Sequence, residues 1–173
     1  MNTQQALSLS AIFVSVISLF ITVLLWRESN RPVVSARVIT HSGGNIMILY
    51  NIEIINSGSR PAKNVRLHIE HKELANATTK EPDRNRNFSK ELYSIKRCFD
   101  ERATVPILLN GSSVSNAFGY TSDESPFWIP GAHLEITITY QGLQGRRYKS
   151  RIPLRIDDTD AFAGTAYASA STS

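Results

Sequence analysis

The feature that most constrains this chain is an uncharged apolar segment near the N-terminus, running from Ala6 to Trp26. An α-helix rises about 1.5 Å per residue, so a helix over residues 6–26 reaches about 31 Å, the thickness of the hydrocarbon core of a bilayer. We interpret this segment as a transmembrane helix that follows a short tail, residues 1–5. Trp26 stands where an interfacial aromatic residue is expected.

A cleaved signal peptide is the competing interpretation of this segment. The first five residues, MNTQQ, contain no Lys or Arg, and the sequence LLWRESN at its end offers no small-x-small cleavage site. The apolar run is also longer than the core of a typical signal peptide. These features favour a retained membrane anchor.

The charges on either side of the segment predict its orientation. No side-chain cation precedes it, whereas Arg27, Arg31 and Arg37 follow it. Because cationic flanks tend to stay on the cytoplasmic side, we expect a single-pass protein of the cell inner (plasma) membrane. Its globular part is then expected in the cytoplasm.

After a juxtamembrane linker, residues 27–32, the apolar pattern changes to period two, which is typical of half-buried strands. Ile52 and Ile54 alternate with polar positions, as do Ile136 and Ile138 around Thr137. About seven short strands are predicted, at residues 33–40, 46–55, 65–69, 104–109, 113–120, 134–140 and 148–156. The last two form a hairpin around the sequence QGLQGR.

These strands predict the fold class. No helical periodicity of useful length is recognised between Pro32 and Ile156, so residues 33–156 are predicted to be all-β. An antiparallel immunoglobulin-like sandwich, preceded by one transmembrane α-helix, buries the apolar faces most simply. The polar stretch 71–91 is expected to be a long exposed connection or a short edge element, and the tail 157–173 to be disordered.

Three stretches of the predicted sandwich carry a family resemblance. YNIEIINSGSRPAKNVRLHIE, VPILLNGSSV and LEITITYQGLQGRRYKSRIPL resemble bacterial immunoglobulin-like modules of the CARDB and adhesion-type class. The matching positions are Asn56, Gly58, Ala62 and Val65, then Leu109, Gly111 and Ser113. Asn110 replaces the usual proline, and Gln141 stands where an acidic residue is common. The resemblance implies the fold and is only weakly informative about function.

Motifs for catalysis or cofactor binding are absent from the sequence, including G-x-S-x-G, the P-loop, H-E-x-x-H and C-x-x-C. On a strand, His68 and Glu70 point to one face and His71 to the other, so the two histidines converge on a metal only if His71 already lies in the turn. Cys98 is the single cysteine, which excludes an intrachain disulfide. We therefore expect no enzyme, no cofactor and no metal.

The last predicted strand carries a basic stripe, which consists of Arg147, Lys149, Arg151 and Arg155. One interpretation is an edge strand that its cations keep from pairing with other sheets. The alternatives are contact with anionic lipid or docking of an acidic partner. Nucleic acid is not expected, because the stripe lacks aromatic residues on which bases stack.

The transmembrane segment itself contains a stripe of small residues at spacings of three and four: Ser8, Ala11, Ser15, Ser18 and Thr22. Small and hydroxylated residues let membrane helices approach closely, so this stripe predicts a packing seam with a second copy or another helix. The alternative is that the hydroxyl groups bond to carbonyls of their own helix.

Two function classes follow. The first is a membrane-anchored, non-enzymatic binding or scaffolding module that recruits a protein partner to the bilayer. The second is an accessory or sensor subunit of a membrane complex that assembles through its transmembrane helix. The net charge of +4 selects neither class and identifies no partner.

Overall fold

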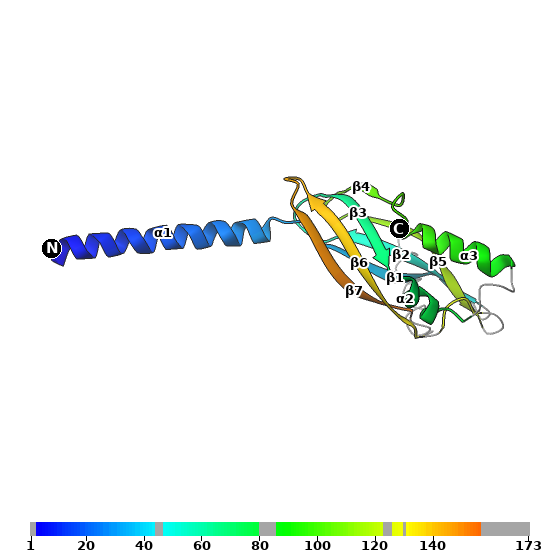
Figure 1. Ribbon diagram of the computed structural model, residues 1–173. Helices are drawn as coiled ribbons and strands as arrows, with labels where there is room; N and C mark the ends of the chain where they lie inside the picture. The colour runs from blue at the N-terminus through cyan, green and yellow to red at the C-terminus, as the bar shows by residue number, and fades with distance from the viewer. Residues whose placement is uncertain (1–2, 44–46, 80–85, 123–125, 130, 157–173) are drawn as a thin grey trace, which may run out of the picture.

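The computed structural model describes residues 3–43, 47–79, 86–122, 126–129 and 131–156 (Figure 1). The tail 157–173, for which disorder is predicted, lies outside the described residues. A long N-terminal helix, α1 (Thr3–Ser29), extends away from a mostly β domain. Within α1, Ser10–Ser29 is long and apolar enough to cross a membrane.

Seven strands form two antiparallel sheets in the described part of the domain. They are β1 (Val34–Gly43), β2 (Met47–Asn56), β3 (Ala62–Ile69), β4 (Val105–Leu108), β5 (Ser113–Ser122), β6 (His133–Gly142) and β7 (Arg147–Arg155). One sheet has the order β1-β2-β5 and the other β4-β3-β6-β7. The seven strands predicted from alternation are confirmed, and β6 and β7 form the predicted hairpin.

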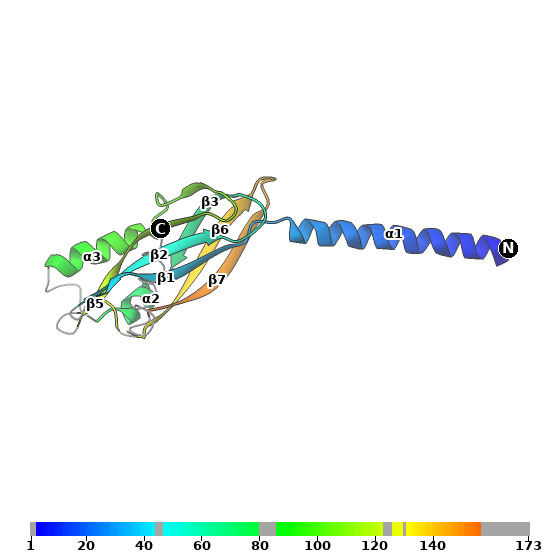
Figure 2. The same ribbon diagram turned by 180° about the vertical axis from the view of Figure 1, so that it is seen from behind.

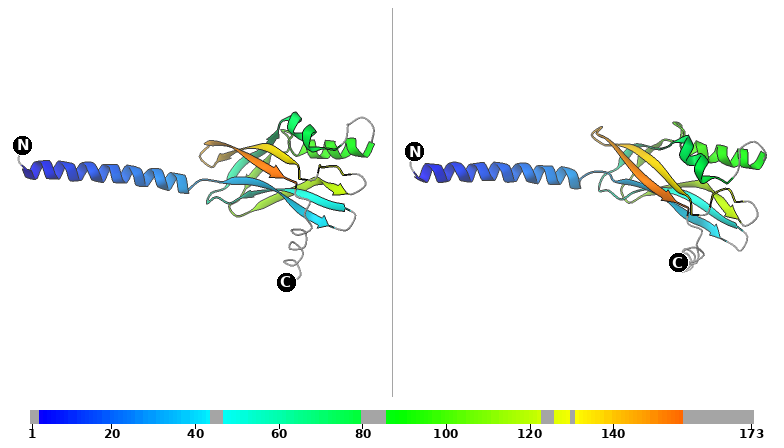
Figure 3. Two further views of the ribbon diagram at one scale, coloured as in Figure 1. Left: turned by 90° about the horizontal axis from the view of Figure 1, so that it is seen from below. Right: turned by 60° about the horizontal axis from the view of Figure 1, so that its bottom comes forward.

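The two sheets lie in separate layers (Figure 3) and enclose one core. Ile52, Ile136 and Ile138 are at most 2% exposed, as the alternation predicts. Thr137 and Thr139, which alternate with these isoleucines on β6, are half-buried. Alternation therefore assigns the inner face of these strands correctly.

Two helices lie at the end of the domain far from α1 (Figure 2): α2 (His71–Ala77) and α3 (Arg86–Arg97). The prediction of no helix between Pro32 and Ile156 is therefore wrong. Each helix is short and buries few apolar residues, Leu74 and Ala77 from α2 and Ile95 from α3. The segment that contains them is polar on average, which concealed the helical spacing of Leu92 and Ile95 in α3.

The strand directions set which parts of the domain lie near α1. The turn between β2 and β3 and the β6–β7 hairpin are at the end next to α1, where β1 also begins (Figures 1 and 2). At the opposite end Phe118, Phe127 and Trp128 pack together, with the Phe118 and Trp128 ring centroids 4.9 Å apart. Aromatic packing therefore closes the far end, while the near end is built around the chain that leaves α1.

Candidate functional site

The junction between α1 and the domain is fastened by one buried asparagine. The side-chain oxygen of Asn56 accepts hydrogen bonds from the backbone N–H groups of Val33 at 3.2 Å and Gly58 at 3.1 Å. Its amide nitrogen donates to the carbonyls of Arg60 at 2.8 Å and Leu108 at 3.1 Å. Asn56 is fully buried, and these four bonds satisfy its amide.

Close backbone contacts tighten the same junction. The N–H of Ser57 donates to the Val33 carbonyl at 2.9 Å, and the Ser59 hydroxyl donates to the Ser29 carbonyl at 2.8 Å. A Cβ on Gly58 would lie 2.3 Å from the backbone nitrogen of Val33, so this close approach requires glycine. The domain is thus held against the end of α1 by direct contacts.

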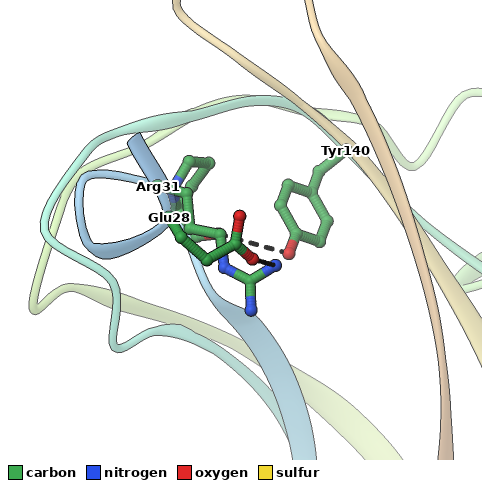
Figure 4. Close-up of polar contacts among 4 residues, drawn as sticks. Glu28, Arg31 and Tyr140 are labelled. Atoms are coloured by element: carbon green, nitrogen blue, oxygen red, sulfur yellow. Dashed lines mark hydrogen bonds and ion pairs between the residues drawn. The ribbon is translucent and has the colours of Figure 1, made fainter. Parts of the chain in front are cut away.

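A tyrosine and an ion pair flank the chain where it leaves α1 (Figure 4). The hydroxyl of Tyr140 donates to the carbonyl of Pro32 at 3.3 Å, and Glu28 pairs with Arg31 at 2.8 Å. The ring of Tyr140 stacks on that of Tyr148, with centroids 5.2 Å apart. The β6–β7 hairpin is therefore part of the junction.

Next to the junction lies a small hollow with a cavity volume of about 80 Å³. Arginines from three segments line it: Arg27 at the end of α1, Arg60 from the turn before β3, and Arg146 from the β6–β7 hairpin. The Arg60 guanidinium carbon lies 6.0 Å from the ring centroid of Trp26, and that of Arg146 lies 5.4 Å from the ring centroid of Tyr148. We call this group the junction hollow.

The predicted basic stripe lies on β7, the outer strand of its sheet. Its four residues are exposed and alternate with half-buried or buried ones. Arg151 lies 3.9 Å from Glu135 on the neighbouring strand β6, and Pro153, which has no backbone N–H, stands within β7 between the last two cations. Because β7 starts at the hairpin near α1 and runs to the far end, the stripe leads away from α1 and only Arg147 is at the near end.

A second exposed edge belongs to β5, which pairs with β2 and with no other strand in the described part. Its second half is covered by α3 and the turn after it, where Phe99 packs against Phe118 with centroids 6.1 Å apart. Its first half, residues 113–117, is exposed at every position. The strand contains no charged residue and no proline.

Beside this exposed half, an apolar groove opens between the two sheets, with a cavity volume of about 270 Å³. Residues of both sheets line it, among them Ile52, Ile54, Leu67, Val105, Val114 and Asn116. On β4 and directly after it, two further apolar side chains are exposed, Ile107 at 54% and Leu109 at 58%. We call this site the β5 groove.

The backbone of the exposed half of β5 has an open side. Residues of an antiparallel strand direct their N–H and C=O groups alternately to its two sides. The N–H of Ala117 donates to the side-chain oxygen of Asn116 at 2.9 Å, so Ala117 faces away from β2. Ser113 and Ser115 share the phase of Ala117, which places their backbone groups along the outer edge.

The titratable residues singled out in the sequence lie apart from one another. Cys98 borders the β5 groove, and burial raises the pKa of its thiol, an effect that a hydrogen bond from Asn116 partly opposes. His68 is exposed and bonds to Thr139 at 2.9 Å, while His71 begins α2. Among the described residues no group of three metal-ligating side chains comes together.

In the small-residue stripe of α1, three hydroxyl groups bond to their own helix. Ser15 donates to the Ala11 carbonyl and Thr22 to that of Ser18, both at 2.8 Å, and Ser8 donates to the Gln4 carbonyl at 3.0 Å. This is the arrangement considered as the alternative to a packing seam. The side chains of α1 from Ala11 to Ser29 are all exposed, and association through the stripe stays a prediction.

Sequence reasoning missed both the junction hollow and the β5 groove. Arg27, Arg60 and Arg146 are far apart in the sequence, and nothing in their local patterns groups them. The exposed half of β5 was predicted as a strand, but its edge position depends on the sheet order, which alternation does not supply.

Comparison with known families assigns the chain to a family, but it does not assign a function. Residues 4–160 match the sequence profile of the family described as Domain of unknown function (DUF8453), so the chain belongs to this family. The match includes most of α1 together with the whole described part of the β domain. A search of curated proteins found no match.

Proposed function

We propose that this chain is a membrane-anchored, non-enzymatic binding module that recruits a protein partner through the β5 groove. The observation that carries the proposal is the exposed, uncharged first half of β5 beside an apolar opening between the sheets. In this function an extended segment of the partner adds to β5 as a further strand and inserts a side chain into the groove.

The strand order supports an immunoglobulin-like sandwich as the scaffold of this module. The first, second and fifth strands form one sheet, and the third, sixth and seventh form the centre and one side of the other. This is the division of strands A, B, E and C, F, G in immunoglobulin-like domains, with β4 added beside β3. The resemblance to bacterial CARDB and adhesion-type modules agrees with this assignment.

Retention of α1 as an anchor is supported by its contacts. Ser29 accepts a hydrogen bond from Ser59, and Trp26 contacts Arg60, so removal of α1 exposes part of the domain end. The family profile spans both α1 and the domain. We place the domain in the cytoplasm at the inner (plasma) membrane, from the arginines that follow the span.

The orientation has a direct test. In a Cys98→Ser background, Glu101→Cys puts a thiol on an exposed turn. With the domain in the cytoplasm, this thiol resists an impermeant maleimide in intact cells and reacts after lysis. Labelling in intact cells would place the domain on the other side of the membrane.

The partner segment is expected to be extended and uncharged where it meets β5. No charged residue lines the β5 groove, and a charge buried there would lack a counter-ion. Main-chain hydrogen bonds to Ser113 and Ser115 give affinity in this mode, and the side chain in the groove gives specificity.

Photo-crosslinking in the native membrane tests the proposal. A photoreactive amino acid at Ser115 of the full chain should capture one partner, whereas the same group at Lys149 on β7 should not. Val114→Asp should abolish the crosslink, because it places a carboxylate in the apolar groove. The matched control is Ile129→Asp, since Ile129 is 39% exposed and Val114 38%, and Ile129 lies at the far end of the domain.

Two results contradict this function. Equal crosslinking from Ser115 and Lys149 shows a surface without a preferred site. Retention of the Ser115 crosslink in a folded Val114→Asp variant shows that the groove is not used.

A second candidate function is an accessory or sensor subunit that assembles with other helices through α1. The tight junction favours it, because a rotation of α1 is transmitted to the domain through Asn56 and Gly58. If this function holds, replacing Ser15 and Ser18 by Leu abolishes helix association in a membrane two-hybrid assay, and Val14→Leu with Ile17→Leu does not. If both pairs of substitutions change association equally, α1 does not associate through the small-residue stripe.

A further inference from the structure

The junction hollow is a second surface, separate from the β5 groove. Its three arginines come from α1, from the turn before β3 and from the β6–β7 hairpin. Guanidinium groups repel one another, so gathering three of them around one hollow costs free energy unless an anion offsets the repulsion.

The hollow contains no such anion of its own. No acidic residue lines it, and Glu28, the acid beside Arg27, is paired with Arg31. Among the described residues, Arg27, Arg60 and Arg146 have no carboxylate partner within ion-pair distance. The hollow therefore presents an uncompensated positive charge to whatever lies next to it.

Two aromatic rings hold the cations in place. Arg60 lies against the ring of Trp26 and Arg146 against that of Tyr148. Such cation–π contacts limit the positions that a long side chain samples, which lowers the entropy cost of binding an anion. Gln144, which also lines the hollow, adds an amide donor.

The position of the hollow decides which anion is nearby. The apolar segment ends at Trp26, and Arg27 follows directly, so the hollow lies at the depth of the lipid headgroups. Arg60 and Arg146 lie far outside the ~20 residues next to a span whose charges set orientation, so topology does not explain them.

We infer that the junction hollow binds the phosphate group of one anionic phospholipid from the leaflet in which α1 ends. Its volume of about 80 Å³ is far below the ~300–1,000 Å³ of pockets for drug-sized ligands, which suits a single small group. Arginine forks match phosphate oxygens in geometry as well as in charge. This inference rests on retention of α1, which is part of the proposed function.

Native mass spectrometry of the full chain, released from mixed micelles, tests the inference. The probes are phosphatidic acid, phosphatidylglycerol and phosphatidylcholine with the same acyl chains. One phosphatidic acid should stay bound, phosphatidylglycerol should bind more weakly and phosphatidylcholine should not bind. The doubly charged monoester is expected to lead because three cations surround it. The intact mass reports at the same time whether α1 is still present.

A pair of double variants separates a site from diffuse attraction. Arg60→Gln with Arg146→Gln should weaken phosphatidic acid binding about thirty-fold, if each cation near the bilayer contributes about 1 kcal/mol. Lys149→Gln with Arg151→Gln removes the same charge from the β7 stripe and should leave binding nearly unchanged. Arg60→Lys with Arg146→Lys keeps the charge without the fork and should lie between them.

Each other outcome overturns the inference. Equal loss in the two Gln variants shows diffuse charge attraction, and equal binding of phosphatidylcholine shows that the anion is not recognised. Displacement of the lipid by a similar concentration of inorganic phosphate shows that the occupant is a free anion. Because the hollow variants leave Ser115 and Val114 intact, the β5 crosslink should persist in them, so a failure here is distinct from a failure of partner recruitment.

Discussion

The outer strands β5 and β7 occupy the same position at the edge of a sheet, but only β7 is protected against pairing with another sheet along its whole length. Each is the last strand of its sheet in the described part and pairs with one neighbour. β7 carries four cations and Pro153, devices that prevent another sheet from pairing with an edge. The first half of β5 carries neither. An unprotected edge strand exposes a protein to aggregation. We therefore expect the exposed half of β5 to have a binding function.

The other two edges sharpen this contrast. β4 is short and contains Pro106, which removes a backbone donor, and β1 lies against β7 from the opposite sheet. In the described part of the chain, the first half of β5 is thus the long edge without proline, charge or cover. That difference connects the sheet order to partner recruitment.

The largest expected effect is on the free energy of unfolding, and it compares one core residue from each sheet. Ile136 on β6, next to β7, is fully buried, whereas Ile52 on β2, next to β5, lines the β5 groove. Ile136→Ala should lower the free energy of unfolding by about 2–5 kcal/mol, and Ile52→Ala by an amount near the lower end, because its cavity merges with an existing opening. Denaturant unfolding of the full chain in detergent, followed by tryptophan fluorescence, measures both.

The control for this comparison is Thr137→Ala, which removes an outward side chain from the same strand as Ile136 and should cost little. If the three variants lose equal stability, the two sides of the core do not differ and the link between the groove and a softer edge is wrong.

A smaller effect, on self-association, is expected when the cations of β7 are removed and a cation is added to β5. Replacing Arg147, Lys149 and Arg151 by Gln should make the full chain self-associate at several-fold lower concentration, because it removes like-charge repulsion along β7. Ser115→Lys protects β5 instead, and should abolish co-purification of the partner with the full chain while leaving the monomer intact. Sedimentation in detergent measures the first effect.

The outcome against this picture is that Ser115→Lys reverses the self-association of the β7 variant. Copies of the chain would then pair through β5, and the contrast between the two edges would disappear.

The contrast also explains how much the sequence could predict. Ile52 and Ile136 were placed correctly because alternation is a local pattern, and the cations of β7 were recognised because charge is visible in sequence. The open half of β5 was not recognised, because a missing device leaves no signal until the strand is known to be an edge. α3 was missed because its sequence is polar on average, although its apolar positions Phe88, Leu92 and Ile95 recur at helical spacing.

The same limit applies to the sites. Arg60 and Arg146 meet at the junction hollow because Asn56 and Gly58 bring the β2–β3 turn against the chain leaving α1. The N-x-G pattern was recognised as part of a family resemblance, but its consequence for the charges around α1 needed the three-dimensional arrangement.

The smallest expected effect concerns Glu53, which ties the open strand β5 to its sheet. Hydrogen bonds from the Ser113 hydroxyl and from the Arg37 guanidinium, 2.6 Å away, lower the pKa of its carboxyl group. A carboxyl group with a folded pKa below its unfolded value of about 4.3 stabilises the fold above that value, and this contribution is lost as the pH falls through the lowered pKa. Glu53→Gln should therefore be less stable than wild type at neutral pH, with a difference that shrinks as the pH drops below about 4.

Ser113→Ala should reproduce part of this behaviour, since it removes the first of the two donors. Lys149→Ala on β7 should shift stability without this acid dependence. Unfolding curves of the full chain between neutral and acid pH measure the difference, and a gap between wild type and Glu53→Gln that stays constant with pH would show that Glu53 does not hold β5 through its charge.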